Sequence, residues 1–181
     1  TVANQPQMVL SIFLLGFGVG QFIMGPLSDR FGRRPILLGG MALYCTASLL
    51  AIAAPSFETL LLARALQGLG TSATRVIATA IVRDCYSGEQ MARVMSLTFL
   101  VFLAVPIAAP SLGQLILLVA PWRWIFGVLG IFGMAVLLWS ALRMPETLHE
   151  EDRMPIELKR IAAAVRLSLT DRVAVGYMLA M

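Results

Sequence analysis

Five apolar stretches of membrane-spanning length restrict what this chain can fold into more than any other feature. Each is close to the roughly 17–25 helical residues that cross a hydrocarbon core. Backbone groups in lipid must bond within their own segment, so each stretch is expected to be an α-helix. The stretches cover approximately residues 7–28, 36–54, 59–82, 94–119 and 124–142, and a sixth begins near residue 172. We therefore predict an all-α membrane protein built as a helix bundle.

The composition favours the same class. Of the 181 residues, 59% are hydrophobic and 13% are charged, whereas a soluble domain carries about 25% charged residues. Charges in such a chain usually set its topology, which argues against nucleic-acid binding. Cys45 and Cys85 are expected at different depths in the membrane, so we predict no disulfide between them.

The basic residues outside the spans predict an orientation. Arg123 falls on one side of the spans, and all the others fall on the opposite side, which the positive-inside rule makes cytoplasmic. The others are Arg30, Arg33, Arg34, Arg83, Arg93, Arg143, Arg153, Lys159, Arg160, Arg166 and Arg172. This places the start of the chain outside, so we expect one further helix before Thr1.

We interpret the chain as a fragment of a longer protein, because it starts at Thr1 and stops at Met181 inside an apolar run. Residues 1–143 hold the first five spans. Residues 144–171 are rich in charge and are predicted to form a cytoplasmic linker, in which residues 156–169 have the composition of an amphipathic helix. Residues 172–181 would start the next span.

A charged segment, residues 25–34, joins the first two spans and is predicted to form a tight turn at the membrane face. It contains Gly25, Asp29, Gly32, Arg33 and Arg34. Asp84 follows the third span and is expected at the same face.

A polar stripe runs along the third span. At 100° per residue its members share one helix face; they are Arg64, Gln67, Gly68, Thr71 and Arg75. Charges inside a bilayer normally face a bundle interior or a watery cavity. The alternative is that the two arginines extend to the interfaces or bond neighbouring helices. We favour a functional role for Arg64, which Gln67 and Gly68 accompany, and leave Arg75 open between the two.

Prolines and small residues mark other spans. Pro106 and Pro110, with Gly113 behind them, predict a bend in the fourth span. Glycines recur in the first and fifth spans at spacings that indicate close helix packing; they are Gly16, Gly18, Gly20, Gly127, Gly130 and Gly133.

The sequence carries no pattern typical of an enzyme. His149 stands alone, without the spacing of a metal site. Nucleotide loops and catalytic triads are absent, and no carboxylate lies within a span. We predict neither an enzyme nor a cofactor.

These motifs resemble the major facilitator superfamily. The run Gly25-x-x-x-Asp29-x-x-Gly32-Arg33-Arg34 is similar to its signature between helices 2 and 3, and Arg64-x-x-Gln67-Gly68 to its fourth-helix motif. Four runs, residues 63–70, 80–84, 122–126 and 145–147, resemble the Bcr/CflA branch of bicyclomycin and chloramphenicol exporters.

The resemblance implies two six-helix halves that work by alternating access in a bacterial inner membrane and exchange an amphipathic drug for protons. The proton gradient is the driving force. This chain would hold helices 2–6 of the N-terminal half, the central loop and the start of helix 7, without helix 1 or the C-terminal half. The proton-carrying carboxylate would lie outside it. A metabolite uniporter or importer, and a non-transporting receptor or scaffold, remain alternatives.

The resemblance also implies roles for individual residues. Gly25, Asp29, Gly32, Arg33, Arg34 and Asp84 would form a cytoplasmic latch, with Arg33 paired to Asp84. Arg64 would face the central cavity and take part in proton coupling. The fourth span matches the antiporter motif only in part, at Pro110 and Gly113, because Ala109 and Gln114 stand where that motif has glycine.

Overall fold

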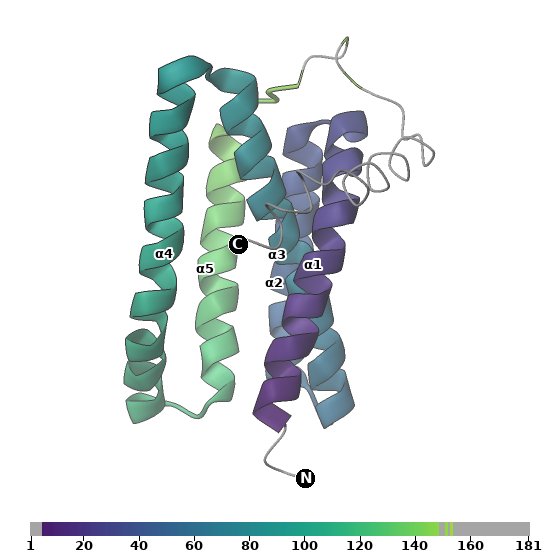
Figure 1. The fold of residues 1–181 in the computed structure, drawn as a ribbon. Coiled ribbons are helices and arrows are strands. Elements are labelled where there is room, and N and C mark those ends of the chain that lie inside the picture. Colours follow the sequence, from purple (N-terminus) through teal and green to yellow (C-terminus); the bar gives the residue numbers. More distant parts are fainter. Residues whose placement is uncertain (1–4, 149–150, 152, 154–181) are drawn as a thin grey trace, which may run out of the picture.

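Five α-helices make up the part of the chain that the computed structural model describes, residues 5–148, 151 and 153. They are α1 (Gln5–Phe31), α2 (Arg33–Ala53), α3 (Phe57–Cys85), α4 (Gly88–Val119) and α5 (Arg123–Arg143), shown in Figure 1. All five predicted spans are helical, and no described residue is in a strand. The predicted amphipathic helix and the sixth span lie outside the described residues.

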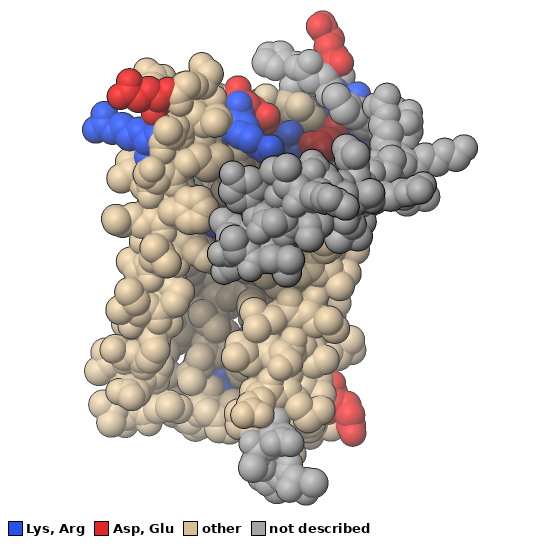
Figure 2. Space-filling view, viewed as in Figure 1, with Lys and Arg blue, Asp and Glu red and all other residues tan. Residues whose placement is uncertain are grey.

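Four of these helices, α1, α2, α4 and α5, are long and apolar enough to cross a membrane. The exception is α3, which has ample length at 29 residues but carries Arg64, Gln67 and Arg75 in its middle. Its lower hydropathy therefore comes from the polar stripe and not from a short helix. Figure 2 shows charged side chains gathered at the ends of the molecule, with a broad, mostly uncharged band between them.

The helices do not pack equally closely. Both α1 and α2 pack along α3, and α5 packs on α2. Helix α4 stands at the side of the bundle in Figure 1, where it touches α3 and α5 only lightly and none of its residues is buried. The described bundle is thus a tight four-helix body with one loosely attached helix.

Small side chains fill the tight interfaces. The buried set contains many alanines and serines, among them Ala47, Ala51, Ala63, Ala73, Ala80, Ser28, Ser48 and Ser72. Large apolar side chains such as Phe22, Leu62 and Ile107 point outward. This inside-out distribution is typical of membrane helices, because lipid accepts large apolar groups and small residues let backbones approach.

Glycines mark the closest approaches. A Cβ on Gly16 would run into the backbone oxygen of Ala65 on α3, and one on Gly20 would run into the Ser72 side chain. A Cβ on Gly18 would meet nothing within 4 Å. The predicted close packing is therefore confirmed at Gly16 and Gly20, which are four residues apart on one face of α1.

Two predicted connections are shorter than expected. The predicted spans 59–82 and 94–119 leave a polar stretch between them, but α3 continues to Cys85 and α4 begins at Gly88. The prediction was wrong because an apolar pattern detects only the part of a helix that lies in lipid, while α4 begins with exposed polar turns. The charged segment is also mostly helical, since α1 runs through Pro26 to Phe31 and Gly32 alone separates it from α2.

Substitution of Gly16 by Ala should lower the stability of the bundle, whereas Gly18→Ala on the same helix should not. The added methyl group at Gly16 meets rigid backbone, and such overpacking typically costs about 1–3 kcal/mol. The midpoint of thermal unfolding of the purified complete protein in detergent measures both. Equal midpoints for the two variants would contradict the close α1–α3 contact.

Candidate functional site

Arg33 joins three helices at one end of the bundle. Its Nε donates to Asp84 Oδ2 at the end of α3, at 3.0 Å. Its Nη1 donates to Asp29 Oδ1 and to Ser28 Oγ on α1, the latter at 2.7 Å, and Ser28 in turn donates to the Gly25 carbonyl. The Arg33 side chain is 9% exposed, and that of Asp29 is 48% exposed. The predicted Arg33–Asp84 ion pair is present, and Asp29 and Ser28 extend it.

The second arginine of the charged segment points to a different helix. Arg34 Nη2 donates to the Ala141 carbonyl near the end of α5 at 2.7 Å. The Glu146 carboxylate, just beyond α5, accepts the backbone N–H groups of Arg33 and Arg34. Residues 33 and 34 therefore connect α2 to α1, α3 and the end of α5. Sequence analysis did not assign Ser28 or Glu146 to this site.

Arg64 lies in the first third of α3 and is tied to two other helices. Its Nη1 donates to Gln67 Oε1 at 2.9 Å, and its Nε points at the Val9 carbonyl of α1 at 3.5 Å. Gln67 Nε2 donates to Ser48 Oγ on α2 at 2.7 Å, and Ser48 donates to the Tyr44 carbonyl. Gln67 and Ser48 are fully buried. This chain of bonds fixes the direction in which the guanidinium points.

Aromatic rings cover the Arg64 guanidinium. Its central carbon lies 4.4 Å from the centre of the Phe13 ring and 5.6 Å from that of Phe126. Cation–π contacts of this kind stabilise a cation where water is scarce. Within the described part of the chain, Arg64 has no carboxylate partner. Among the described residues, its positive charge is therefore met by dipoles and rings and not by an acid.

Arg75 lies on the same face of α3, and α4 covers it. Its guanidinium carbon is 4.3 Å from the centre of the Phe102 ring and 5.2 Å from that of Phe99. It borders a cavity of about 320 Å³ between α3 and α4, lined also by Thr71 and Pro106. Thr71 bonds back to the Gln67 carbonyl. The predicted stripe therefore faces two environments, the α1–α5 rings at Arg64 and this cavity at Arg75.

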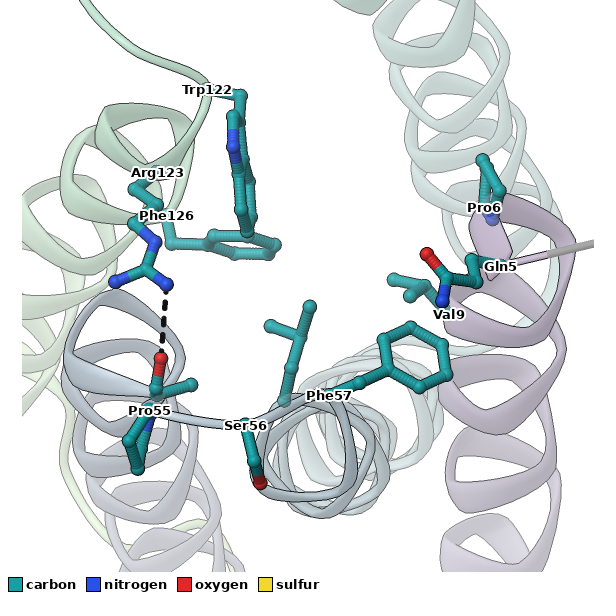
Figure 3. A pocket seen from close by; sticks show the side chains of 11 residues that line it. Gln5, Pro6, Val9, Pro55, Ser56, Phe57, Trp122, Arg123 and Phe126 are labelled. Carbon is teal, nitrogen blue, oxygen red and sulfur yellow. Dashed lines mark hydrogen bonds between the residues drawn. The ribbon is translucent and has the colours of Figure 1, made fainter. Parts of the chain in front are cut away.

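A larger cavity of about 550 Å³ opens at the other end of the bundle, where α1 begins (Figure 3). Trp122 and Phe126 from α5 and its preceding turn face Phe57 and Val9 across it. The Phe126 ring also lies 5.6 Å from the Arg64 guanidinium carbon, so one side chain belongs to both the cavity wall and the Arg64 site. Arg123 borders the same cavity.

Arg123 has a structural role at this end. Its Nη2 donates to the Ala54 carbonyl at 3.1 Å, and its Nη1 approaches the Ile52 carbonyl at 3.5 Å. These carbonyls end α2, where a cation satisfies free acceptors and the helix dipole. Helix capping therefore accounts for Arg123 at this end of the bundle.

Other predicted residues take less part in the contacts. Gly68 is buried against the Phe13 backbone, where a Cβ would not fit. Gly25 has room around it. Pro106, Pro110 and Gly113 lie within a continuous α4, so the prolines do not end the helix. Among the described residues, no cluster of histidine, cysteine or acidic side chains could hold a metal ion.

Comparison with known proteins agrees with this arrangement. The sequence profile described as the Major Facilitator Superfamily matches residues 3–181. An "Uncharacterized MFS-type transporter YdgK" of Bacillus subtilis is 39% identical over 98% of this chain and 44% of its own length. The "Bicyclomycin resistance protein homolog" of Haemophilus influenzae is 34% identical over the same shares. "Multidrug resistance protein D" of Escherichia coli is 38% identical over 78% of this chain and 36% of its own.

The chain thus spans less than half the length of these curated relatives. A solved structure, that of the human organic anion transporter MFSD10 (TETRAN), aligns with 92% of this chain and 37% of its own at a TM-score of 0.72. At 24% identity that likeness concerns the fold alone. With apolar helices and a profile match along nearly its whole length, this multi-pass membrane chain belongs to the Major Facilitator Superfamily of transporters.

Proposed function

We propose that this chain is most of the N-terminal half of a proton-driven exporter of amphipathic, drug-like molecules in a bacterial inner membrane. In this proposal it supplies helices 2–6 of twelve, and the protein works by alternating access. The observation that carries it is Arg64, a cation held by Gln67 and two rings that has no carboxylate partner among the described residues. The bicyclomycin and multidrug resistance proteins among the relatives support the substrate class.

Arg64 itself does not carry the proton, since arginine stays protonated in proteins. Its role in the proposal is electrostatic. The fixed guanidinium stabilises the ionised form of a carboxylate that faces it from a part of the complete protein outside this chain, and so favours proton release at one stage of the cycle. The described carboxylates do not take this role, because none of them pairs with Arg64. They lie at helix ends or after α5: Asp29, Glu58, Asp84, Glu89, Glu146 and Glu151.

The Arg33 junction serves as the latch of the cycle. Arg33 and Asp84 lie on different helices at the face that the basic residues mark as cytoplasmic. Their bond holds this face closed while the cavity is open outward. The half-exposed Asp29 carboxylate remains available to a helix N-terminus of the second half.

Two alternatives differ from this proposal in what they require of Arg64. A uniporter or importer needs no proton coupling, and a receptor or scaffold needs no cavity charge at all. A buried cation raises the free-energy cost of membrane insertion, and a non-transporting bundle would gain nothing in return. Arg64 therefore favours transport over a scaffold, and the dependence of transport on the pH gradient separates an antiporter from a uniporter.

Arg64→Ala should abolish proton-driven efflux while the protein still accumulates in the membrane. Arg64→Lys keeps the charge but loses the planar donors to Gln67, and should retain part of the activity. The measurement is efflux of a fluorescent amphipathic cation from proteoliposomes of the complete protein under an imposed pH gradient. Efflux by Arg64→Ala at the wild-type rate would leave Arg64 as a packing residue only.

The latch predicts a rescue between opposite charges. Arg33→Asp and Asp84→Arg should each reduce transport, and the double variant should recover part of it because the ion pair re-forms in reverse. Recovery will be incomplete, since Ser28 and Asp29 also bind Arg33. A double variant no better than either single variant would rule the pairing out as a functional contact.

The orientation can be tested by labelling single cysteines with a membrane-impermeant maleimide. In a Cys45→Ala, Cys85→Ser background, Pro55→Cys and Pro121→Cys should react in intact cells, and Glu89→Cys only after lysis. Glu89 is used because the adjacent Gly88 has a φ of +56°, which a cysteine would strain. Labelling of Glu89→Cys in intact cells would reverse the orientation.

A further inference from the structure

Helix α2 begins without a cap from its own sequence. The residue before it is Gly32, which has no side chain to accept the free N–H groups of the first turn. Those groups are instead bonded by a residue 113 positions away: Glu146 Oε1 accepts the Arg33 N–H at 2.9 Å. Its Oε2 accepts the Arg34 N–H at 3.2 Å. A carboxylate at this position also complements the positive end of the helix dipole.

Gly32 has two separate reasons to be glycine here. Its φ is +101°, a conformation that side chains disfavour. A Cβ at this position would also run into the Glu146 carboxylate, with Oε2 the nearest atom and Cδ 3.0 Å away. The glycine thus leaves the space that the carboxylate occupies. This contact links one residue of the charged segment to the chain that leaves α5.

The same carboxylate also organises its own segment. Glu146 Oε1 accepts the N–H groups of Thr147 and Leu148 at 3.0 and 3.1 Å. Burial acts to raise the pKa of Glu146, but the backbone bonds from Leu148, Arg33, Arg34 and Thr147 outweigh it and hold that pKa below its ordinary value. Glu146 is therefore ionised at neutral pH.

Arg34 fastens the same two helices from the opposite direction. Its side chain donates to the Ala141 carbonyl in the last turn of α5, while the carboxylate beyond α5 binds the first turn of α2. The start of α2 and the end of α5 thus cap each other. Arg33 takes part on both sides, because its backbone N–H is held by Glu146 and its side chain by Asp84.

We propose that Glu146 is a positioning residue of the latch, which fixes the backbone of Arg33 so that the side chain meets Asp84, and ties the segment after α5 to that contact. The proposal rests on the proposed alternating-access function. In this arrangement, movement of the segment beyond α5 is transmitted to the Arg33–Asp84 bond through the Glu146 carboxylate.

The test follows the latch without any substrate. Thr79 borders the cavity between α3 and α4, near the cytoplasmic end of α3, so a Thr79→Cys probe reports opening of that end. In inside-out vesicles of the complete protein, lacking its native cysteines, Glu146→Gln should raise the maleimide labelling rate of this probe roughly tenfold, the change that corresponds to losing one charge-assisted hydrogen bond. Asp84→Asn should do the same, and the double variant should exceed neither single variant by much. The matched control is Glu89→Gln, an exposed acid in the first turn of α4, which should change nothing.

Gly32→Ala provides a second, independent variant, since it displaces the carboxylate and leaves Glu146 in place. It should raise labelling in the same way, but alanine also strains the backbone at a φ of +101°, so additivity is judged between Glu146→Gln and Asp84→Asn alone. Unchanged labelling in Glu146→Gln, or additive effects with Asp84→Asn, would overturn the proposal. A fall in unfolding midpoint without faster labelling would likewise reduce Glu146 to a structural cap. The labelling test uses no substrate, so a negative result there concerns Glu146 alone. A failure of the proposed proton-driven efflux would instead appear in the transport assay of the Arg64 variants.

Discussion

Close contact between α3 and its two neighbours, at backbone distance, is the constraint on which the rest of the structure depends. Gly16 and Gly20 of α1 let the α3 helix approach closely, because they have no side chain. On the other interface, a Cβ on Gly70 of α3 would lie 2.6 Å from the Gly40 carbonyl oxygen of α2. Helices held this closely leave no room between them for long side chains. Arg64 and Arg75 of α3 therefore point away from these closest contacts, and rings of α1, α5 and α4 meet them there. Only the long charged members of the stripe are excluded in this way, because Gln67 and Gly68 lie within the contacts of α3 with α2 and α1.

The two arginines of that stripe differ in how firmly they are held. Arg64 has a directional partner in Gln67, which is itself bonded to Ser48 across the α2–α3 interface. Within the described residues, the Arg75 guanidinium contacts two rings, both from α4, the least tightly packed helix. Movement of α4 would thus alter the surroundings of Arg75 and leave those of Arg64 in place. This difference supports a fixed electrostatic role for Arg64 and assigns none to Arg75.

Much of this architecture could be predicted from the sequence because its causes are local. Apolar length predicts the helices, and the 100° periodicity places Arg64 and Gln67 on one face. The boundaries of α3 and α4 could not be predicted, since their polar ends continue as helix outside the apolar zone. The contacts of Ser48 and Glu146 could not be predicted either, because their partners Gln67 and Arg33 lie 19 and 113 residues away in the sequence. A serine in an apolar span and an acid after one carry no signal of such pairing until the helices are assembled.

The paired arginines at the start of α2 show why a lysine would not serve there. Arg33 uses Nε for Asp84 and Nη1 for Asp29 and Ser28, so its planar donors reach acceptors on two helices in different directions. An ammonium group could supply the charge but not this fixed fork. Arg34 projects the other way and reaches a backbone carbonyl of α5. Adjacent residues on a helix point about 100° apart, so two consecutive arginines at one helix start are enough to connect α2 with the remaining three helices of the tight body. The charged segment is thereby a structural junction as well as a latch, and the glycine before it leaves room for the acid that holds both arginine backbones.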